Sequence, residues 1–283
     1  MDVLDLTLEH LEGITHHDIE LFLSYLSNYR FNGKHLSCDE RAKARKLSAV
    51  RALFKYFFNR GLIDVDNSAK VSTPKLHDKE IIRLEPDETA MLLDFIEKGG
   101  DNLTGQQKVY YEKTKQRDLA IVTLLLGTGL RVSECVGLDL EDVDFKAYGI
   151  KIVRKGGSEM IVYFGDEVAD ALLNYIEGDR AAVTPIAGHE HALFYSTQRK
   201  RIGVRAVENL VKKYAKHVTP LKTITPHKLR STYGTALYQE TGDIYLVADV
   251  LGHKDVNTTK KHYASVGDTR RRSAAKYVKL RED

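Results

Sequence analysis

One stretch of the chain, VSTPKLHDKEIIRLEPDE at residues 71–88, constrains the fold more than any other. It carries two prolines, charges of both signs and almost no hydrophobic periodicity, whereas helical patterns stand on either side of it. Such a segment is typical of an extended linker, and Pro86 can occupy the first turn of the helix that follows. The chain is therefore expected to fold as two units, and its 283 residues are enough for two domains.

The unit before the linker is expected to be small and helical. Residues 14–29 and 39–61 show the spacing of hydrophobic side chains that is typical of amphipathic helices. Gly61 suits the end of the second helix, because glycine adopts the backbone conformation that commonly terminates helices. We therefore predict a helical domain over residues 1–72, followed by a linker over residues 73–86.

The unit after the linker is expected to be mostly helical around one small sheet. Residues 148–164 contain alternating runs of β-branched residues around Gly156 and Gly157, which predicts a two-stranded hairpin. Helical patterns cover residues 88–98, 117–126, 166–176, 204–217, 226–239 and 244–251, and residues 99–111 are expected to form a polar loop. The predicted fold class is mainly α, with a mixed α/β domain over residues 87–266 and a small β-sheet.

Composition excludes several classes of protein. The chain is 42% hydrophobic and 29% charged, and it has no run of 18 apolar residues and no signal peptide, so a soluble protein without a membrane partner is expected. Its two cysteines, Cys38 and Cys135, match neither a disulfide framework nor a paired-cysteine metal site. These features fit a reducing cytoplasm, and no metal site is expected.

The formal net charge is only +3, so a nucleic-acid partner has to be argued from where the charge lies. Residues 41–60 contain seven basic side chains and no acid, on a helix whose other face is apolar. We take as candidate DNA contacts Arg41, Lys43, Arg45, Lys46, Arg51 and Lys55, together with a second acid-free cluster of Arg199, Lys200, Arg201 and Arg205. Two such clusters joined by a linker suggest a clamp around a duplex, and a solvated cationic face is the alternative.

The residues from 225 to 266, TPHKLRSTYGTALYQETGDIYLVADVLGHKDVNTTKKHYASV, begin with a predicted helix start. Thr225 can cap this helix with Pro226 at its first position. His227 and Arg230, three residues apart, then lie on one face of the first turn. Because that turn also presents backbone N–H groups and the positive end of the helix dipole, a phosphate is favoured beside it.

The same stretch ends with a predicted helix stop. Gly252 is the permissive residue of the sequence LGH, so His253 is expected to leave its helix at a fixed point. Tyr263 follows ten residues later, and we expect it on a short helix that begins at Asn257 or Thr258. A connection of this length can fold the tyrosine back toward the face that carries His227.

Together these motifs resemble those of the tyrosine recombinases, the phage integrase family, of the Xer or transposon-integrase kind. The resemblance rests on GTGLRVSE at residues 127–134, a lysine in VRKGGSE, HKLR at 227–230, LGH at 251–253 and HY at 262–263. Each motif is weak alone, but their order and spacing are those of the family over essentially the whole chain. The unit before the linker then resembles a core DNA-binding domain.

The resemblance implies a site-specific recombinase that cleaves and rejoins DNA through a 3′-phosphotyrosyl intermediate. The implied catalytic residues are Arg131, Lys155, His227, Arg230, His253 and the nucleophile Tyr263, with Glu134 holding Arg131. The implied partners are double-stranded recombination sites, and the family also allows accessory proteins. No cofactor is implied, since the phosphotyrosyl bond conserves the energy needed for rejoining.

The chemistry of these residue types agrees with that assignment. Two arginines form a fork-shaped clamp for the nonbridging oxygens of a phosphate. The two histidines can hydrogen-bond the phosphate or move the proton of the nucleophile, and Lys155 can protonate the leaving 5′ oxygen from its hairpin. Tyr263 supplies the attacking oxygen.

Each residue also has a structural alternative. Tyr263 is one of 15 tyrosines and could be a packed aromatic side chain, while Arg131 and Glu134 could form a surface ion pair. Lys155 could be a solubilising turn residue, and the two histidines could be structural. A type IB topoisomerase or a non-catalytic DNA-binding protein remains the alternative at the level of function.

The segment after Tyr263 is expected to form a tail helix over residues 267–283. Ala274, Tyr277, Val278 and Leu280 form an apolar stripe that is too short to be stable alone. In the family such a tail docks into a neighbouring protomer, which implies a homotetramer on two DNA sites. The resemblance also implies that the first helix of the core-binding domain lies outside this chain.

Overall fold

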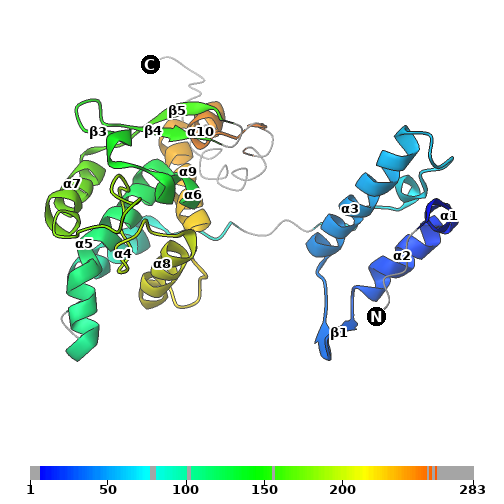
Figure 1. Cartoon of the computed structure of the whole chain (residues 1–283), viewed down its shortest axis with the longest axis horizontal. Helices are drawn as coiled ribbons and strands as arrows, with labels where there is room; N and C mark the ends of the chain where they lie inside the picture. Colours follow the sequence, from blue (N-terminus) through cyan, green and yellow to red (C-terminus); the bar gives the residue numbers. More distant parts are fainter. Residues whose placement is uncertain are drawn as a thin grey trace, which may run out of the picture. The chain divides into compact units, whose positions relative to one another are not determined.

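The computed structural model describes residues 7–76, 81–100, 103–154, 157–253, 255–256 and 259 (Figure 1). The chain divides into two compact units, Met1–Glu80 and Ile81–Asp283. The division falls inside the stretch that the sequence analysis assigns to the linker. The predicted tail helix and the short helix expected around Tyr263 lie outside the described residues.

The first unit consists of short helices and one small hairpin. Its elements are α1 (Leu8–Gly13), α2 (His16–Tyr25), β1 (Tyr29–Phe31), β2 (Lys34–Leu36), α3 (Glu40–Asn59) and the 3₁₀ helix η1 (Asn67–Lys70). Thr15 caps α2, since its side chain accepts a hydrogen bond from the backbone N–H of Asp18 at 3.2 Å. Leu23, Leu47 and Phe54 belong to the buried core that holds α2 and α3 together.

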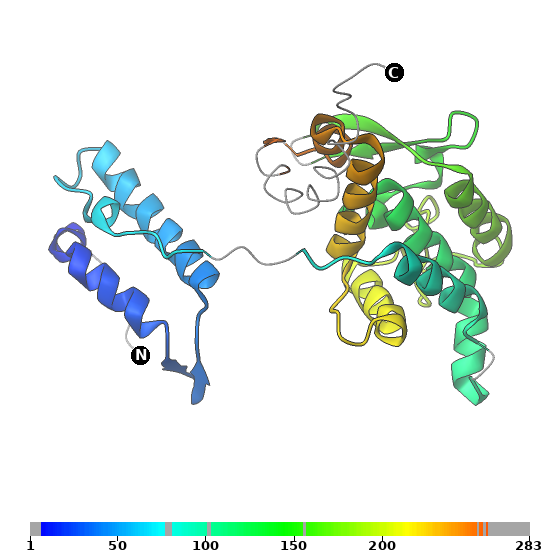
Figure 2. The ribbon, with the colours of Figure 1, turned by 180° about the vertical axis from the view of Figure 1, so that it is seen from behind.

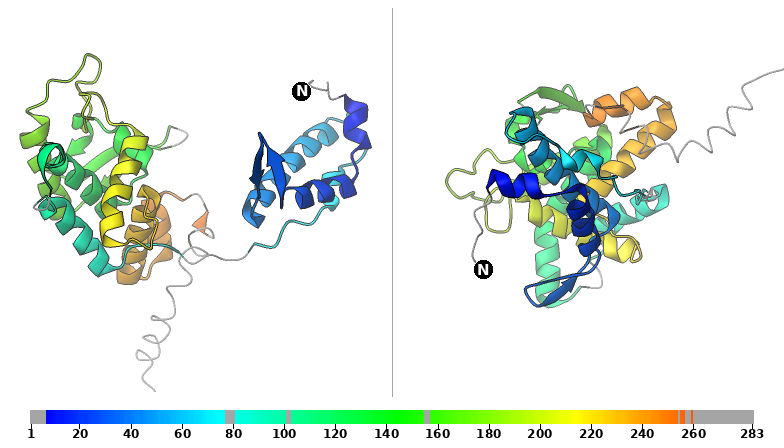
Figure 3. Two further views of the ribbon diagram at one scale, coloured as in Figure 1. Left: turned by 90° about the horizontal axis from the view of Figure 1, so that it is seen from below. Right: turned by 90° about the vertical axis from the view of Figure 1, so that its right-hand side faces the viewer.

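The hairpin corrects the prediction of one helix over residues 14–29. Helix α2 ends at Tyr25, and strands β1 and β2 pair antiparallel at one end of the unit (Figures 1 and 3). Asn32 and Gly33 between them both have positive φ, at 48° and 74°. An Asn-Gly pair readily adopts this turn conformation, so the sequence carried a hairpin signal that helical periodicity obscured.

The second unit is mainly helical. Its helices are α4 (Pro86–Lys98), α5 (Gly105–Thr128), α6 (Val132–Gly137), α7 (Asp166–Tyr175), α8 (Val204–Val218), α9 (Pro226–Thr241) and α10 (Ile244–Leu251), with the short helices η2 (Leu140–Asp142) and η3 (Ile176–Arg180). Figure 1 shows α5 entering the middle of the unit, where it contacts α4, α7 and α9. The fully buried Ile121, Leu124 and Leu125 of α5 form the centre of the core.

The predicted hairpin over residues 148–164 is confirmed. Strands β3 (Val143–Asp144), β4 (Gly149–Val153) and β5 (Glu159–Tyr163) form an antiparallel sheet in that order. Ile150 of β4 pairs with Val162 of β5, and both are buried, whereas Val153 is exposed. The sheet lies at the same end of the unit as α10 (Figure 2).

Helix α5 is much longer than its apolar pattern predicts. The predicted loop over residues 99–111 is helical from Gly105 onward, so that prediction is wrong for its second half. Tyr111 explains the extension, because its buried hydroxyl donates to the carbonyl of Ile96 in α4 at 2.8 Å. None of the described helices is long and apolar enough to cross a membrane.

Candidate active site

The GTGLRVSE motif forms the turn between α5 and α6. Gly129 ends α5 in the left-handed region, with φ at 65°, and Arg131 is the residue that precedes the first turn of α6. Glu134 accepts two hydrogen bonds of 2.8 Å, one from the backbone N–H of Arg131 and one from its guanidinium Nη1. The Glu134 side chain is 6% exposed and that of Arg131 is 40% exposed, so the pair is buried on the carboxylate side and open to solvent on the guanidinium side.

Arg230 lies on α9, which begins at Pro226 after the N-cap Thr225 as the sequence predicts. It is 5% exposed, and its Nη1 donates to the carbonyl of Gly129 at 2.5 Å. Its Nη2 donates to the carbonyl of Leu251 at the end of α10. One buried guanidinium therefore joins the ends of α5 and α10.

The predicted stop at the end of α10 is also confirmed. Gly252 caps the helix with φ at 60°, in the left-handed region. Its carbonyl accepts from Nη2 of Arg131 at 3.2 Å, and the backbone N–H of His253 donates to the carbonyl of Ala248 at 2.9 Å. The His253 Nδ1 lies 2.7 Å from Thr259 Oγ1. This contact of Nδ1 orients the His253 ring.

His227 lies in the first turn of α9 and is exposed. Partial burial of its ring lowers its pKa, and the positive charges of Lys228, Arg230 and Arg131 lower it further. The lowered pKa favours the neutral form of His227 in the DNA-free protein. Because the charges of Arg131 and Arg230 act on it, His227 lies close to both guanidinium groups.

The structure thus brings Arg131, Arg230, His227 and His253 together at the ends of α5, α9 and α10. Lys155 and Tyr263, the two remaining residues of the predicted set, lie outside the described residues. Arg154, which the sequence analysis did not single out, reaches the same helix end from β4. Its position directly before Lys155 was the only local signal that could have drawn attention to it.

The basic residues of the first unit divide into two kinds. The guanidinium of Arg51 donates to the carbonyl of Val71 at 2.5 Å and to Thr73 Oγ1 at 2.8 Å, and so holds the chain after α3. Arg41, Arg45, Lys46 and Lys55 are exposed, while Lys43 pairs with Glu40 at 2.9 Å. A phosphate contact by Arg51 would require these internal hydrogen bonds to break.

The second basic cluster divides in the same way. Arg201 donates to the carbonyls of Gly137 and Leu138 at 2.9 and 2.7 Å and pairs with Asp139. Arg199, Lys200 and Arg205 are exposed, and Arg205 pairs with Glu208 at 3.1 Å. Arg201 therefore has a structural role at the end of α6, which a count of charges along the sequence could not reveal.

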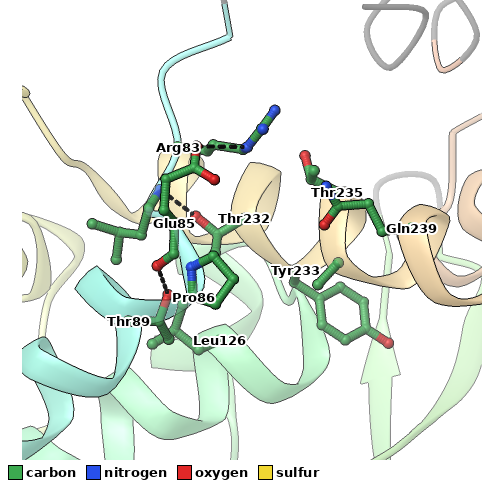
Figure 4. A pocket seen from close by; sticks show the side chains of 11 residues that line it. Arg83, Glu85, Pro86, Thr89, Leu126, Thr232, Tyr233, Thr235 and Gln239 are labelled. Atoms are coloured by element: carbon green, nitrogen blue, oxygen red, sulfur yellow. Dashed lines mark hydrogen bonds and ion pairs between the residues drawn. The ribbon is translucent and has the colours of Figure 1, made fainter. Parts of the chain in front are cut away.

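A pocket lies on another side of α9, between residues 83–89, Leu126 of α5 and the second half of α9 (Figure 4). The backbone N–H of Leu84 donates to Thr232 Oγ1 at 3.0 Å beside it. The residues that line this pocket include none of the predicted catalytic residues. Within the part of the chain that the structure describes, no group of three His, Cys, Asp or Glu residues could hold a metal ion.

The comparison with protein-family models decides the family. The model described as "Phage integrase family" matches residues 83–270, which is more than half of the chain. The chain belongs to the phage integrase family. It is a tyrosine-type site-specific DNA recombinase, an enzyme that cleaves and rejoins DNA strands through a 3′-phosphotyrosyl intermediate.

Individual relatives of this integrase-family chain agree with that assignment. The tyrosine recombinase XerC of Caldanaerobacter subterraneus subsp. tengcongensis is 31% identical over 97% of this chain and 71% of its own length. The tyrosine recombinase XerS of Streptococcus agalactiae is 32% identical over 97% of this chain and 82% of its own length.

Solved structures confirm the fold of this family member. The XerH site-specific recombinase bound to a palindromic difH substrate matches with a TM-score of 0.74 and 20% identity, over 94% of this chain and 73% of that one. The Tn1549 transposon integrase in complex with circular intermediate DNA matches with a TM-score of 0.69 and 23% identity, over 93% and 85%. The predicted fold class, mainly α with a small sheet, is therefore confirmed.

Proposed function

We propose that Arg131 and Arg230 form the clamp for the scissile phosphate in this recombinase. The observation that carries the proposal is that both guanidinium groups bind consecutive carbonyls, those of Gly252 and Leu251, at one helix end. Glu134 holds Arg131 from the other side. Two preorganised guanidinium groups can stabilise the negative charge that develops on the nonbridging oxygens without first rearranging.

The remaining residues have roles in forming and breaking the bonds at the phosphate. The hydroxyl oxygen of Tyr263 attacks phosphorus, and the bond from phosphorus to the 5′ oxygen breaks, so that a 3′-phosphotyrosyl link and a free 5′ hydroxyl form. His227, whose lowered pKa favours the neutral form, and His253 hydrogen-bond the phosphate or accept the tyrosine proton. Lys155 gives a proton to the leaving oxygen. The reverse steps on a new 5′ hydroxyl rejoin the strand.

We further propose that Met1–Glu80 acts as a core DNA-binding domain and that the partner is a double-stranded recombination site. The exposed side chains of Arg45 and Lys46 on α3, and of Arg199 and Lys200 in the second unit, support contacts to the phosphate backbone. A cytoplasmic location and a role in moving or resolving a DNA element fit the family. Accessory proteins would select among these outcomes.

Replacing Tyr263 by phenylalanine tests the nucleophile. Tyr263→Phe removes one hydroxyl, so DNA binding is expected to persist while the covalent protein–DNA adduct disappears. The adduct is measured by denaturing gel on a nicked duplex selected for binding from a random library. Tyr245→Phe is the matched control, because Tyr245 is 71% exposed on α10, and it is expected to form a normal amount of adduct. A normal adduct from Tyr263→Phe would contradict the assignment.

We also propose that the tail over residues 267–283 docks into a neighbouring protomer and links a tetramer on two DNA sites. The support is its apolar stripe, which cannot be stable alone and must be buried somewhere. Deleting Ser273–Asp283 is then expected to abolish synaptic complexes of two DNA sites, while binding to a single site persists. A truncated chain that still forms such complexes on native gels would show that the tail does not link protomers.

A further inference from the structure

Arginine side chains hold the C-terminal end of α10, together with backbone hydrogen bonds from Gly252 and His253. The last carbonyls of a helix have no partner within that helix and need donors from elsewhere. Here Arg154 donates to the carbonyls of Asp249 and Val250, Arg230 donates to Leu251, and Arg131 donates to Gly252. Four consecutive carbonyls thus accept from three guanidinium groups. Two of these groups belong to the proposed phosphate clamp.

Arg154 contacts two of these carbonyls and also packs against Gly252. Its Nη2 donates to the carbonyl of Val250 at 2.8 Å and its Nη1 to that of Asp249 at 3.4 Å. The guanidinium lies directly against Gly252, where an added Cβ atom would stand 1.6 Å from Nη1. Gly252 therefore serves two purposes, since it adopts a positive φ and leaves room for the Arg154 side chain.

The backbone of Arg154 belongs to the β4–β5 hairpin. Its N–H donates to the carbonyl of Ser158 at 2.8 Å, and its own carbonyl accepts from the N–H of Gly157 at 3.0 Å. These bonds continue the ladder of β4 and β5 into the turn. Arg154 therefore joins two elements that lie nearly a hundred residues apart in the sequence, and we call this link the Arg154 bridge.

We propose that Arg154 is a positioning residue for the general acid, because the Arg154 bridge ties the hairpin that carries Lys155 to the helix end that holds the arginine clamp. Lys155 is the next residue in the chain, so a change in the backbone at Arg154 is passed directly to the attachment point of Lys155. The inference rests on the proposed role of Lys155 and adds a residue that acts through it.

The environment of the Arg154 guanidinium is unfavourable for its positive charge. Burial lowers the pKa of Arg154, the positive charge of Arg131 acts in the same direction, and Glu134 opposes them. The buried Nε of Arg154 has no hydrogen-bond partner among the described residues.

A direct role in binding DNA phosphate is the alternative for Arg154. Both terminal nitrogens of Arg154 donate to carbonyls of α10, as those of Arg230 donate to the carbonyls of Gly129 and Leu251, so DNA affinity and the sulfur substrate described below separate the two roles. Lys151 on the same strand offers a comparison. Its side chain is 54% exposed and pairs with Glu159 at 2.9 Å, so it belongs to the hairpin without contacting α10 through any of the described contacts.

A substrate with sulfur in the 5′-bridging position separates these roles, because the sulfur leaves without needing a proton. On ordinary DNA, Arg154→Ala is expected to slow cleavage by roughly 10²-fold, the effect of a small misplacement of a catalytic group. On the sulfur substrate Arg154→Ala and Lys155→Ala should both cleave at the wild-type rate. Arg154→Lys keeps the charge but lacks the rigid guanidinium fork that spans the two carbonyls, so it should behave like Arg154→Ala. Lys151→Ala is the control and should cleave both substrates normally.

The possible results are distinct. Rescue of Lys155→Ala together with Arg154→Ala, with unchanged DNA affinity and melting temperature, supports the bridge. If Lys155→Ala is rescued but Arg154→Ala is not, Arg154 acts through the arginine clamp or on DNA, and the inference is wrong. If Lys155→Ala itself is not rescued, the proposed general acid is wrong, and the bridge as a positioning device for it is overturned as well. A normal rate for Arg154→Lys on ordinary DNA would also overturn the two-carbonyl geometry.

Discussion

Replacing Gly129 by alanine should damage the stability of the second unit and the catalytic site together. Gly129 has φ at 65°, and an added Cβ would lie 2.5 Å from Cδ1 of Tyr233 and 2.9 Å from Cδ2 of Leu251. The left-handed conformation costs an alanine roughly 1–2 kcal/mol. Displacing the packed ring and methyl group adds roughly 1–3 kcal/mol. The free energy of unfolding is therefore expected to fall by about 2–5 kcal/mol.

The same change should reduce catalysis through Arg230. The carbonyl of Gly129 accepts from Nη1 of Arg230 at 2.5 Å, so any backbone shift at residue 129 moves a guanidinium of the proposed clamp. A misplacement of this kind is expected to lower the rate of covalent adduct formation by about 10²-fold. DNA affinity should change much less, since most of the phosphate contacts lie elsewhere.

Differential scanning calorimetry and a single-turnover cleavage assay measure both effects. A unit of this size loses roughly 2–4 °C of melting temperature per kcal/mol, so Gly129→Ala should lower it by about 4–20 °C. Gly137→Ala is the matched control, because no atom lies within 4 Å of its added Cβ and its φ is not positive. Should Gly129→Ala melt and cleave like Gly137→Ala, the argument from backbone conformation and close packing is wrong.

Two further predictions concern charge. Arg45→Ala combined with Lys46→Ala should reduce the magnitude of the slope of log K, the DNA-binding constant, against log salt by up to ~1.8, at about 0.9 per phosphate contact. Arg51→Ala should leave this slope nearly unchanged and should lower the melting temperature. Fluorescence anisotropy at several salt concentrations measures the slope, and an equal reduction from Arg51→Ala would contradict its structural role. Folding lowers the pKa of His227, so the unfolded chain binds the proton more readily than the folded one. The free energy of unfolding should therefore fall as the pH drops below about 6.5. His227→Asn should make this fall in stability smaller. Urea unfolding at pH 7 and at lower pH tests it, and a histidine NMR titration with an ordinary pKa for His227 would refute it.

Much of the site was predictable because its landmarks are local. Pro226 at the start of α9 and Gly252 at the end of α10 follow from backbone rules that involve only neighbouring residues. These two landmarks place His227 and His253 at helix ends. The hairpin before Lys155 was predictable for the same reason, since alternation and a glycine turn lie within one short stretch.

Local rules also failed where two patterns competed or where a partner was distant. The end of α2 was missed because helical periodicity continued into the Asn-Gly hairpin. The first half of α5 was missed because its polar residues give no apolar pattern, and only the contact of Tyr111 with α4 explains its order. In both cases tertiary packing decided which local tendency prevailed.

The sequence by itself determined which residue types are present, in what order, and where the helices with clear local signals, such as the start of α9 and the end of α10, have their limits. The tertiary structure alone decided which arginines are available for DNA and which are structural. Arg131 and Arg230 reach carbonyls that lie 121 and 101 positions away in the chain, and Arg51 and Arg201 are likewise held by distant backbone groups. An arginine side chain is long and binds any acceptor that the fold brings within about 3 Å of its guanidinium group. The spacing of residues along the sequence does not predict which acceptor that is.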